Sequence, residues 1–268
     1  MSDKKKNKVN KIAVVTGASS GIGKATAEYL AGRGWTVYGL ARREIKDEKI
    51  RGIVCDVTDE VAVGRAFEEI YAKEGRIDAL VNNAGMGISG AAEYIPAEKS
   101  KKLYELNLIA VSECSRLALP YLKKTKGKIV NVSSIAAIIP IPFQTAYSAS
   151  KAAVNSFTEA LRLEVEPLGV KVCAVMPGDT KTGFTDARDK TDASADYGDR
   201  LNGSVKKMEK DERGGKSPVS VAKAIYKNLS RKNPPPLKAV GFEYKAVCFL
   251  RKILPERLLL FIVKKIYG

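Results

Sequence analysis

Short apolar runs rich in β-branched residues alternate with helical patterns along most of this chain of 268 residues. The strand candidates are 11–16, 36–41, 52–55, 79–82, 128–132 and 171–175, and the helical patterns between them include 24–33, 59–73, 100–121 and 149–166. This alternation is typical of βαβ units and a parallel sheet. Because the strand candidates are apolar throughout, we expect helices on both faces of the sheet. The sequence therefore predicts one doubly wound α/β domain over residues 1–268.

The last third of the chain has a different pattern. Residues 183–216 are polar and rich in Asp, Gly and Lys, which predicts a mobile loop region. Residues 237–242 form an edge-strand candidate, and residues 245–267 form an amphipathic segment interrupted at Pro255. We accordingly expect a cofactor and catalytic core over 10–182, a substrate loop and helix over 183–236, and an edge strand with an amphipathic extension over 237–268.

Targeting signals and cysteine usage indicate where the protein works. No apolar stretch approaches the ~20 residues of a membrane-spanning helix, and the basic N-terminus lacks the apolar core of a signal peptide. The four cysteines are far apart and form no CxxC pair, so we expect free thiols. These features predict a cytoplasmic protein.

The net charge of +16 is concentrated at the two ends of the chain. Residues 1–11 carry five Lys against one Asp, and residues 201–268 carry 16 Lys and Arg against five Asp and Glu. The body between them is nearly neutral, with 25 cationic against 24 anionic residues. Basic ends suit a nucleic acid, an anionic membrane, an acidic substrate or simply a solvated surface. No known nucleic-acid-binding motif accompanies them, so we predict no nucleic-acid partner.

A glycine-rich turn follows the first strand candidate and opens the first helical pattern. Residues 16–23 read TGASSGIG, in which Gly17 permits the tight turn, Gly21 a close approach to a pyrophosphate, and Gly23 close packing of helix and strand. The helix N-terminus then faces the phosphates of a dinucleotide. The residues of this turn expected at the cofactor are Gly17, Ser19, Ser20, Gly21, Ile22 and Gly23.

The end of the second strand candidate bears on which dinucleotide binds. An acidic residue at this place binds the ribose 2′-hydroxyl of NAD, but the sequence here is Leu-Ala-Arg-Arg over 40–43. The guanidinium groups of Arg42 and Arg43 suit a 2′-phosphate, which Arg binds with two parallel hydrogen bonds. The alternative is that both arginines begin a solvated loop. We predict a preference for NADP(H) over NAD(H).

The chain contains no histidine, which restricts its proton chemistry. Ser-His-Asp and Cys-His catalysis and His-containing zinc sites are excluded, and we predict no metal. Tyr147 and Lys151 lie four residues apart on one face of a predicted helix. A nearby ammonium group stabilises a phenolate, so Lys151 is expected to lower the pKa of Tyr147 from its usual ~10. Ser134 follows a strand candidate and is expected at the ligand-binding end of the sheet.

Together these residues resemble the short-chain dehydrogenase/reductase family over about residues 10–182. The motifs occur in the family's order, and the 13-residue gap from Ser134 to Tyr147 also matches: TGASSGIG at 16–23, Asp56-Val57, NNAG at 82–85, Asn107, Ser134, YSASK at 147–151 and Pro177-Gly178. The resemblance implies a Rossmann-type fold and an NADP-dependent alcohol dehydrogenase or carbonyl reductase. Tyr147 is then the proton donor or acceptor, Lys151 its partner, Ser134 the group that orients the substrate oxygen, and Asn107 the holder of a relay water.

The resemblance also implies further contacts with the cofactor. Asp56 and Val57 are expected at the adenine ring, and Ala41 stands where NAD-dependent members carry an acid. Lys151 is expected at the nicotinamide ribose. The remaining predicted cofactor contacts are Asn83, Ala84, Gly85, Tyr147, Pro177, Gly178 and Thr182.

The substrate is less constrained than the reaction. The chain lacks the TGxxxxVDGG ending of many tetrameric members, and its apolar, basic C-terminus is loosely similar to members acting on hydroxysteroids and other lipophilic alcohols. Met86, Ile141, Phe143 and Phe184 lie just beyond the family motifs and are expected to line the substrate pocket. We therefore expect a lipophilic ketone or alcohol, such as a hydroxysteroid or a bile-acid-like molecule.

Several alternatives stay open. One is a reductase of small ketones or ketoacyl groups, and another is a non-catalytic NADP-binding regulatory or membrane-surface protein. The C-terminal segment has three interpretations: it packs over the active site or a neighbouring subunit, it contacts a membrane peripherally, or it attracts an anionic substrate. Family members commonly assemble, so a homo-oligomer, dimer or tetramer, is expected.

Overall fold

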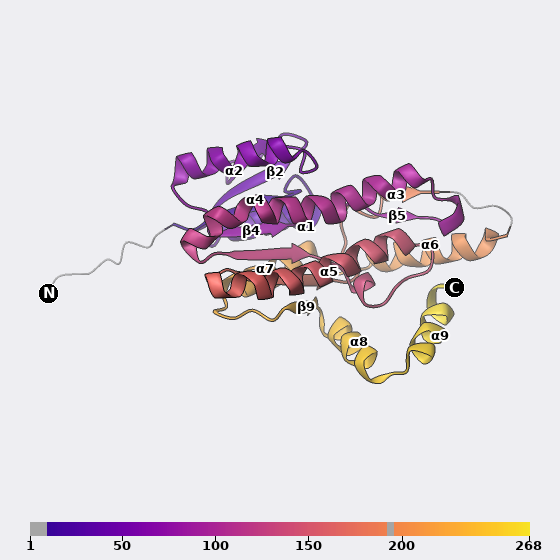
Figure 1. The fold of residues 1–268 in the computed structure, drawn as a ribbon. Helices are drawn as coiled ribbons and strands as arrows, with labels where there is room; N and C mark the ends of the chain where they lie inside the picture. The colour runs from indigo at the N-terminus through magenta and orange to yellow at the C-terminus, as the bar shows by residue number, and fades with distance from the viewer. Residues whose placement is uncertain (1–9, 192–195) are drawn as a thin grey trace.

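The central sheet of the computed structural model, which describes residues 10–191 and 196–268, consists of seven parallel strands (Figure 1). Their order is β3-β2-β1-β4-β6-β7-β9, which confirms the predicted doubly wound α/β fold. The strands are β1 (Ile12–Thr16), β2 (Thr36–Ala41), β3 (Ile50–Val54), β4 (Ala79–Asn82), β6 (Lys128–Val132), β7 (Lys171–Pro177) and β9 (Leu237–Val240). Most of the basic N-terminal segment, residues 1–9, lies outside the described residues.

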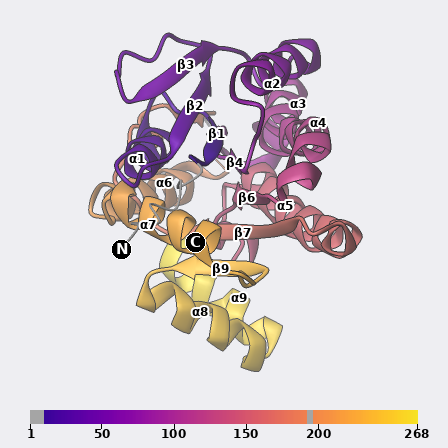
Figure 2. The same ribbon diagram turned by 90° about the vertical axis from the view of Figure 1, so that its left-hand side faces the viewer.

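Helices cover both faces of the sheet, as Figure 2 shows. Because successive side chains of a strand point to opposite faces, Ile12 and Val14 pack on one side, and Ala13 and Val15 on the other. Helices α2 (Glu60–Glu74), α4 (Ala110–Thr125) and α5 (Thr145–Val165) cover the first face. Helices α1 (Gly21–Ala31) and α7 (Pro218–Ser230) cover the second. The result is two apolar cores separated by one sheet.

The strand order creates a crevice at one edge of the sheet. The chain runs outward from β1 to β2 and β3, and then returns to the other side of β1 with β4. Connections that depart in opposite directions leave a gap at the carboxyl ends of the strands, where open α/β sheets bind ligands. The glycine turn after β1, the NNAG segment after β4 and Ser134 after β6 all lie at this edge.

Two predicted segments differ in the structure. The helix expected over 100–121 is divided into α3 (Ala97–Tyr104), a π-helical turn (Glu105–Ile109) and α4. The segment expected to be a loop over 183–216 contains helix α6 (Gly198–Arg213), and residues 192–195 of it lie outside the described residues. Helix α6 forms because Leu201, Ser204 and Met208 share one buried face, while its many charged residues lie on the other. A short pair of strands, β5 (Ile88–Ser89) and β8 (Asp189–Lys190), stands apart from the main sheet.

The last two helices of the chain are amphipathic, and in Figure 1 they project from the rest of the molecule in the shape of a V. These are α8 (Phe242–Ile253) and α9 (Glu256–Tyr267), and the predicted break at Pro255 separates them. Leu259 and Val263 of α9 are buried against Ile135, Ile139 and Met176. Among the described helices, none combines the length and the hydropathy needed to span a membrane.

Candidate active site

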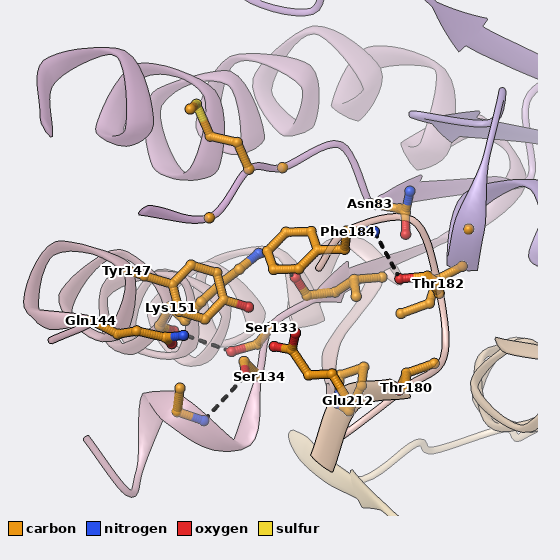
Figure 3. Close-up of a pocket in the computed structure, with 18 of the residues that line it drawn as sticks. Asn83, Ser133, Ser134, Gln144, Tyr147, Lys151, Thr180, Thr182, Phe184 and Glu212 are labelled. Carbon is orange, nitrogen blue, oxygen red and sulfur yellow. Dashed lines mark hydrogen bonds between the residues drawn. The ribbon is translucent and has the colours of Figure 1, made fainter. Parts of the chain in front are cut away.

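A cavity of about 1640 Å³ lies at the carboxyl edge of the sheet. It runs from the glycine turn and the end of β2, past Ser134, Tyr147 and Lys151, to the inner sides of α8 and α9. Figure 3 shows its central part, with Tyr147, Lys151 and Ser134 side by side. Its volume exceeds the range of ordinary small-ligand pockets, about 300–1,000 Å³, which indicates space for more than one small molecule.

The glycine turn forms a cradle with the geometry of a pyrophosphate site. Gly17 and Gly21 have φ values of +65° and +54°, which L side chains rarely adopt. A Cβ atom on Gly23 would lie 2.2 Å from the carbonyl oxygen of Gly17, so only glycine allows helix α1 to approach the turn this closely. Ser19, Ser20, Gly21 and Ile22 line the cavity at the N-terminus of α1, where backbone N–H groups attract phosphates. Gly23 itself supports the turn from behind and does not line the cavity.

The segment after β4 holds this turn in place. The Asn83 side chain donates a hydrogen bond of 3.0 Å to the carbonyl oxygen of Thr16, and the Thr16 hydroxyl accepts from the backbone N–H groups of Asn83 and Ala84. Asn83, Ala84 and Gly85 therefore line the cavity beside the cradle.

The end of the cavity next to β2 and β3 is lined by two arginines and one aspartate. Arg42 and Arg43 follow β2, are exposed and line the cavity, and neither forms an ion pair with any described residue. Asp56 and Val57 line the same end after β3. The Asp56 carboxylate is held by the backbone N–H and hydroxyl of Thr58, at 3.0 and 2.8 Å. This donor set fits a dinucleotide with its adenine near Asp56 and Val57.

Tyr147, Lys151 and Ser134 meet in the middle of the cavity. Tyr147 and Lys151 come from successive turns of α5, and the Lys151 ammonium lies 6.0 Å from the centre of the Tyr147 ring. The Lys151 Nζ atom donates a hydrogen bond of 3.0 Å to the carbonyl oxygen of Val132, at the end of β6. Ser134 accepts a hydrogen bond from the backbone N–H of Ala136, which fixes its hydroxyl two residues beyond β6.

Burial shifts the pKa values of both titratable groups. It raises the pKa of Tyr147 above its usual value, although a hydrogen bond with Ser134 acts in the opposite direction. Burial also lowers the pKa of Lys151 to about 8. The sequence predicted a lowered pKa for Tyr147. The structure differs because burial of the Tyr147 phenol outweighs its hydrogen bond with Ser134, and because the Lys151 ammonium is directed to the Val132 carbonyl.

Asn107 lies in the π-helical turn between α3 and α4. Its amide oxygen accepts from the backbone N–H of Met86 at 2.8 Å, and its amide nitrogen donates to the Met86 carbonyl and to Ser150. The π-turn, a feature common at functional sites, places Asn107 toward Gly85 and the buried catalytic region. Its role in holding a relay water stays a prediction.

Three comparisons with known proteins agree with this geometry. The model of the short chain dehydrogenase family matches residues 11–193. The chain belongs to this family. It is 46% identical over 235 residues to a 3-ketodihydrosphingosine reductase from Bacteroides thetaiotaomicron, with 86% of this chain and 87% of the relative covered.

Two further relatives cover almost the whole chain. The protein is 32% identical over 269 residues to an NADPH-dependent 3-dehydrocapnine reductase from Ornithobacterium rhinotracheale, which covers 92% of this chain and 94% of the relative. A crystal structure of a short-chain dehydrogenase from Streptomyces avermitilis superposes with a TM-score of 0.82 at 31% identity, covering 96% of both chains. The chain is therefore an oxidoreductase of the short-chain dehydrogenase type, a family that binds a nicotinamide cofactor.

In this short-chain dehydrogenase, the segment after β7 joins the cofactor end to the C-terminal helices. Pro177, Gly178 and Thr182 line the cavity, and Thr182 lies against the glycine turn, where a Cβ atom on Gly21 would meet it at 3.5 Å. Tyr244 of α8 packs directly on Gly178. Its hydroxyl donates to the Asp179 carboxylate at 2.6 Å and accepts from the Asp179 backbone N–H at 2.8 Å.

Three of the four residues predicted to line a substrate pocket line this cavity. These are Met86, Ile141 and Phe184, and the Phe184 ring lies 5.8 Å from that of Tyr147. Phe143 does not line the cavity, and the prediction for it is wrong. It adopts a φ of +62° and packs against Ala91 and Leu201 of α6 instead. The sequence concealed this because α6 was expected to be a loop.

The structure also reveals lining residues that the sequence did not single out. Among the lining residues from Pro177 onward, the charged ones are Asp179, Asp186 and Glu212, whereas Lys101, Lys102 and Glu105 line the cavity from α3 and the π-helical turn. Glu212 accepts a hydrogen bond of 2.7 Å from Thr185 and pairs with the buried Arg188. The Glu212 charge raises the pKa of Tyr147, and the Arg188 charge lowers it. Burial raises the pKa of Asp179. No motif marks Glu212, because only the packing of α6 brings it near Tyr147.

Apolar side chains of α8 and α9 also line the cavity. The lining residues from these helices and their connection are Tyr244, Val247, Leu250, Leu254, Leu259, Ile262, Val263, Ile266 and Tyr267. The C-terminal segment therefore packs over the active site on its inner side, as one of the three interpretations expected.

Proposed function

We propose that this short-chain dehydrogenase is an NADPH-dependent reductase of a long-chain amino ketone of the 3-ketodihydrosphingosine type. One relative is named a 3-ketodihydrosphingosine reductase and another a 3-dehydrocapnine reductase. The observation that carries the proposal is the composition of the cavity. Its catalytic residues lie between a cofactor half and a substrate half that is acidic near Tyr147 and apolar along α8 and α9.

The residues of this chain supply the acid chemistry for ketone reduction. The bound cofactor supplies the hydride that adds to the carbonyl carbon. Tyr147 gives its hydroxyl proton to the carbonyl oxygen, and Ser134 donates a hydrogen bond to the same oxygen. A raised pKa keeps Tyr147 protonated at neutral pH, which is the form that reduction requires. The Lys151 ammonium lies 6.0 Å from the centre of the Tyr147 ring, and its part in the proton transfer stays a prediction.

The preference for NADPH rests on the end of β2. Ala41 offers no carboxylate to a ribose 2′-hydroxyl, and Arg42 and Arg43 are unpaired among the described residues. Guanidinium groups that are not engaged elsewhere can bind a 2′-phosphate at full strength. One relative is itself named as NADPH-dependent.

The acidic lining favours an amine over a carboxylate in the substrate. Glu212, which is paired with Arg188, acts on Tyr147, and Asp179 and Asp186 line the same cavity, so an ammonium group beside the ketone finds complementary charge. A bile-acid-like carboxylate would be repelled if it lay in the same place. The long apolar wall of α8 and α9 also exceeds what a small ketone can cover.

A substrate panel tests the proposal. The full chain is mixed with NADPH and, in turn, 3-ketodihydrosphingosine in detergent micelles, a ketosteroid, a bile-acid ketone and an acetoacetyl thioester. We expect the long-chain amino ketone to show the highest kcat/KM, with sphinganine as the product. Faster reduction of a steroid or of the thioester would reject this substrate and support the alternative concerned.

Cellular location and assembly belong to the same proposal. We place the reaction in the cytoplasm, where NADPH is regenerated, and expect copies of the chain to form a dimer or tetramer. Size-exclusion chromatography with light scattering measures the assembly directly.

A further inference from the structure

The outer face of α8 and α9 is the most apolar exposed surface that the structure describes. Phe242, Phe249 and Phe261 are 83%, 63% and 56% exposed. We call the following set the outer face: Phe242, Phe249, Leu250, Ile253, Leu258, Leu260, Phe261, Ile262 and Ile266. The remaining exposed large apolar residues of the described chain are scattered singly over other elements. Concentrated apolar exposure of this kind marks a binding surface.

The outer face continues into the active-site cavity. Leu250, Ile262 and Ile266 belong both to the outer face and to the cavity lining. Figure 1 shows α8 and α9 projecting from the body as a V, and Figure 2 places them beyond β9, at one edge of the sheet. The cavity therefore opens onto the outer face, and its apolar wall is continuous with the exposed apolar surface.

Cations surround the outer face. Helices α8 and α9 carry six basic residues against two acidic ones, and each acid is already engaged: Glu243 with Lys216 at 2.7 Å and Glu256 with Arg251 at 3.0 Å. The exposed cations are Lys245, Lys252, Arg257, Lys264 and Lys265. This combination of apolar side chains flanked by Lys and Arg is the pattern of a helix that lies in the interface of an anionic bilayer.

A second copy of the chain is a poorer occupant of the outer face. Self-association through this face would bring the two sets of cations together, with no free carboxylate among α8 and α9 to oppose them. An anionic lipid surface, in contrast, satisfies the cations and the apolar side chains at the same time.

We propose that the outer face of α8 and α9 docks on an anionic lipid surface, so that the cavity opens toward the bilayer. Each helix has 12 residues, so both lie along the interface and neither crosses it. A lipid substrate can then pass between bilayer and cavity along Leu250, Ile262 and Ile266 without exposing its chain to water. This delivery role rests on the proposed function, whereas the docking itself does not.

Vesicle co-sedimentation of the full chain tests the docking. Vesicles of phosphatidylcholine alone are compared with equal mixtures of phosphatidylcholine and phosphatidylglycerol, at low and high salt. We expect most of the protein to pellet with the anionic vesicles at low salt, less at high salt, and little with phosphatidylcholine alone. Absence of binding to anionic vesicles at low salt would overturn the proposal.

Matched variants locate the contact. Phe249→Gln with Phe261→Gln removes apolar anchors that do not line the cavity, and Lys264→Gln with Lys265→Gln removes two cations. Each pair should reduce the vesicle-bound fraction several-fold. The controls are Val61→Gln with Leu168→Gln, and Lys223→Gln with Lys227→Gln, which change similar exposed residues elsewhere. Equal loss of binding in the variants and the controls would contradict the proposed surface.

Two readouts separate this proposal from its alternatives. Light scattering can show that the Phe249 and Phe261 substitutions dissociate an oligomer. If they do, and if the wild type does not bind vesicles, a second copy covers the outer face and the proposal fails. If wild type binds anionic vesicles but does not reduce the long-chain amino ketone, the docking stands and the proposed function fails. Reduction of a soluble short ketone should be the same in all variants.

Discussion

At the scale of single residues, the proposed proton donor is a tyrosine whose burial favours its protonated form. Burial raises the pKa of Tyr147, and the charge of the nearby Glu212 raises it further. Lys151 lies one helical turn away and is itself buried. Ser134 is fixed by the turn after β6. A different local contact positions each of these side chains, so each can be tested by its own substitution.

Replacing the Tyr147 hydroxyl should remove turnover and leave the cofactor cradle intact. Tyr147→Phe is expected to lower kcat by about 10³-fold, within the range typical of a general acid. Binding of NADPH, followed by its fluorescence, should change little because the cradle is formed by α1 and the β1 turn. A Tyr147→Phe enzyme that kept most of its kcat would contradict the assignment of Tyr147 as proton donor.

Because Lys151 is buried, we expect the free energy of unfolding to rise with pH above about pH 8. Its pKa is about 8 in the folded chain, and about 10.4 is usual for the unfolded chain. Between these values the unfolded state binds more protons, so the free energy of unfolding increases as pH rises from 8 to 10. Relative to Lys151→Met, the wild type should gain about 2–3 kcal/mol over this window in urea unfolding. A flat difference would mean that Lys151 stays charged in the folded state.

The arginine pair after β2 should govern the choice between the two dinucleotides. Arg42→Ala with Arg43→Ala is expected to raise the KM for NADPH about 10- to 100-fold, the equivalent of lost charge-assisted hydrogen bonds. The KM for NADH should stay nearly constant, since NADH lacks the 2′-phosphate. An equal effect on both cofactors would show that the arginines do not contact that phosphate.

At the scale of secondary-structure elements, the strands and the helices that pack directly on the sheet were predictable from the sequence. Their apolar patterns are local, and the motif residues follow directly from strand ends. The π-helical turn at Asn107 and helix α6 were not predictable in the same way. The Asn107 side chain in this turn accepts a hydrogen bond from the Met86 backbone N–H and donates one to Ser150, and these residues lie far from Asn107 in the sequence. Helix α6 has few apolar residues, so its sequence alone does not indicate a buried face. That face is evident only in the folded chain, where Phe143 packs on Leu201.

The contact between α8 and the β7 segment gives an element-scale prediction. A Cβ atom on Gly178 would lie 2.0 Å from the Tyr244 ring, so Gly178→Ala must displace Tyr244 and break its hydrogen bonds to Asp179. We expect a loss of about 1–3 kcal/mol in the free energy of unfolding and a higher KM for the long-chain substrate. Gly64→Ala is the control, since nothing lies within 4 Å of its Cβ position. Equal stability of the two variants would show that α8 does not depend on this contact.

At the scale of the whole molecule, the two ends of the cavity carry different charged side chains. The cofactor end presents Arg42 and Arg43, and the substrate half presents Asp179, Asp186 and Glu212. The net charge of +16 suggests nothing of this internal polarity, because most of the excess lies in the terminal segments. The sequence predicted that Ser134, Tyr147 and Lys151 share one site, and the structure brings them to one cavity, but the sequence did not indicate Glu212, which comes near Tyr147 only through the packing of α6.

The most direct test of a reductase for long-chain amino ketones compares two substrates that differ only in the amine. With NADPH, kcat/KM is measured for 3-ketodihydrosphingosine and for the ketone of the same length that lacks the amino group, both in identical micelles. The acidic lining predicts a preference of at least about tenfold for the amino ketone, equivalent to one charge-assisted hydrogen bond. Equal values, or a preference for the ketone without the amine, would contradict the proposed substrate.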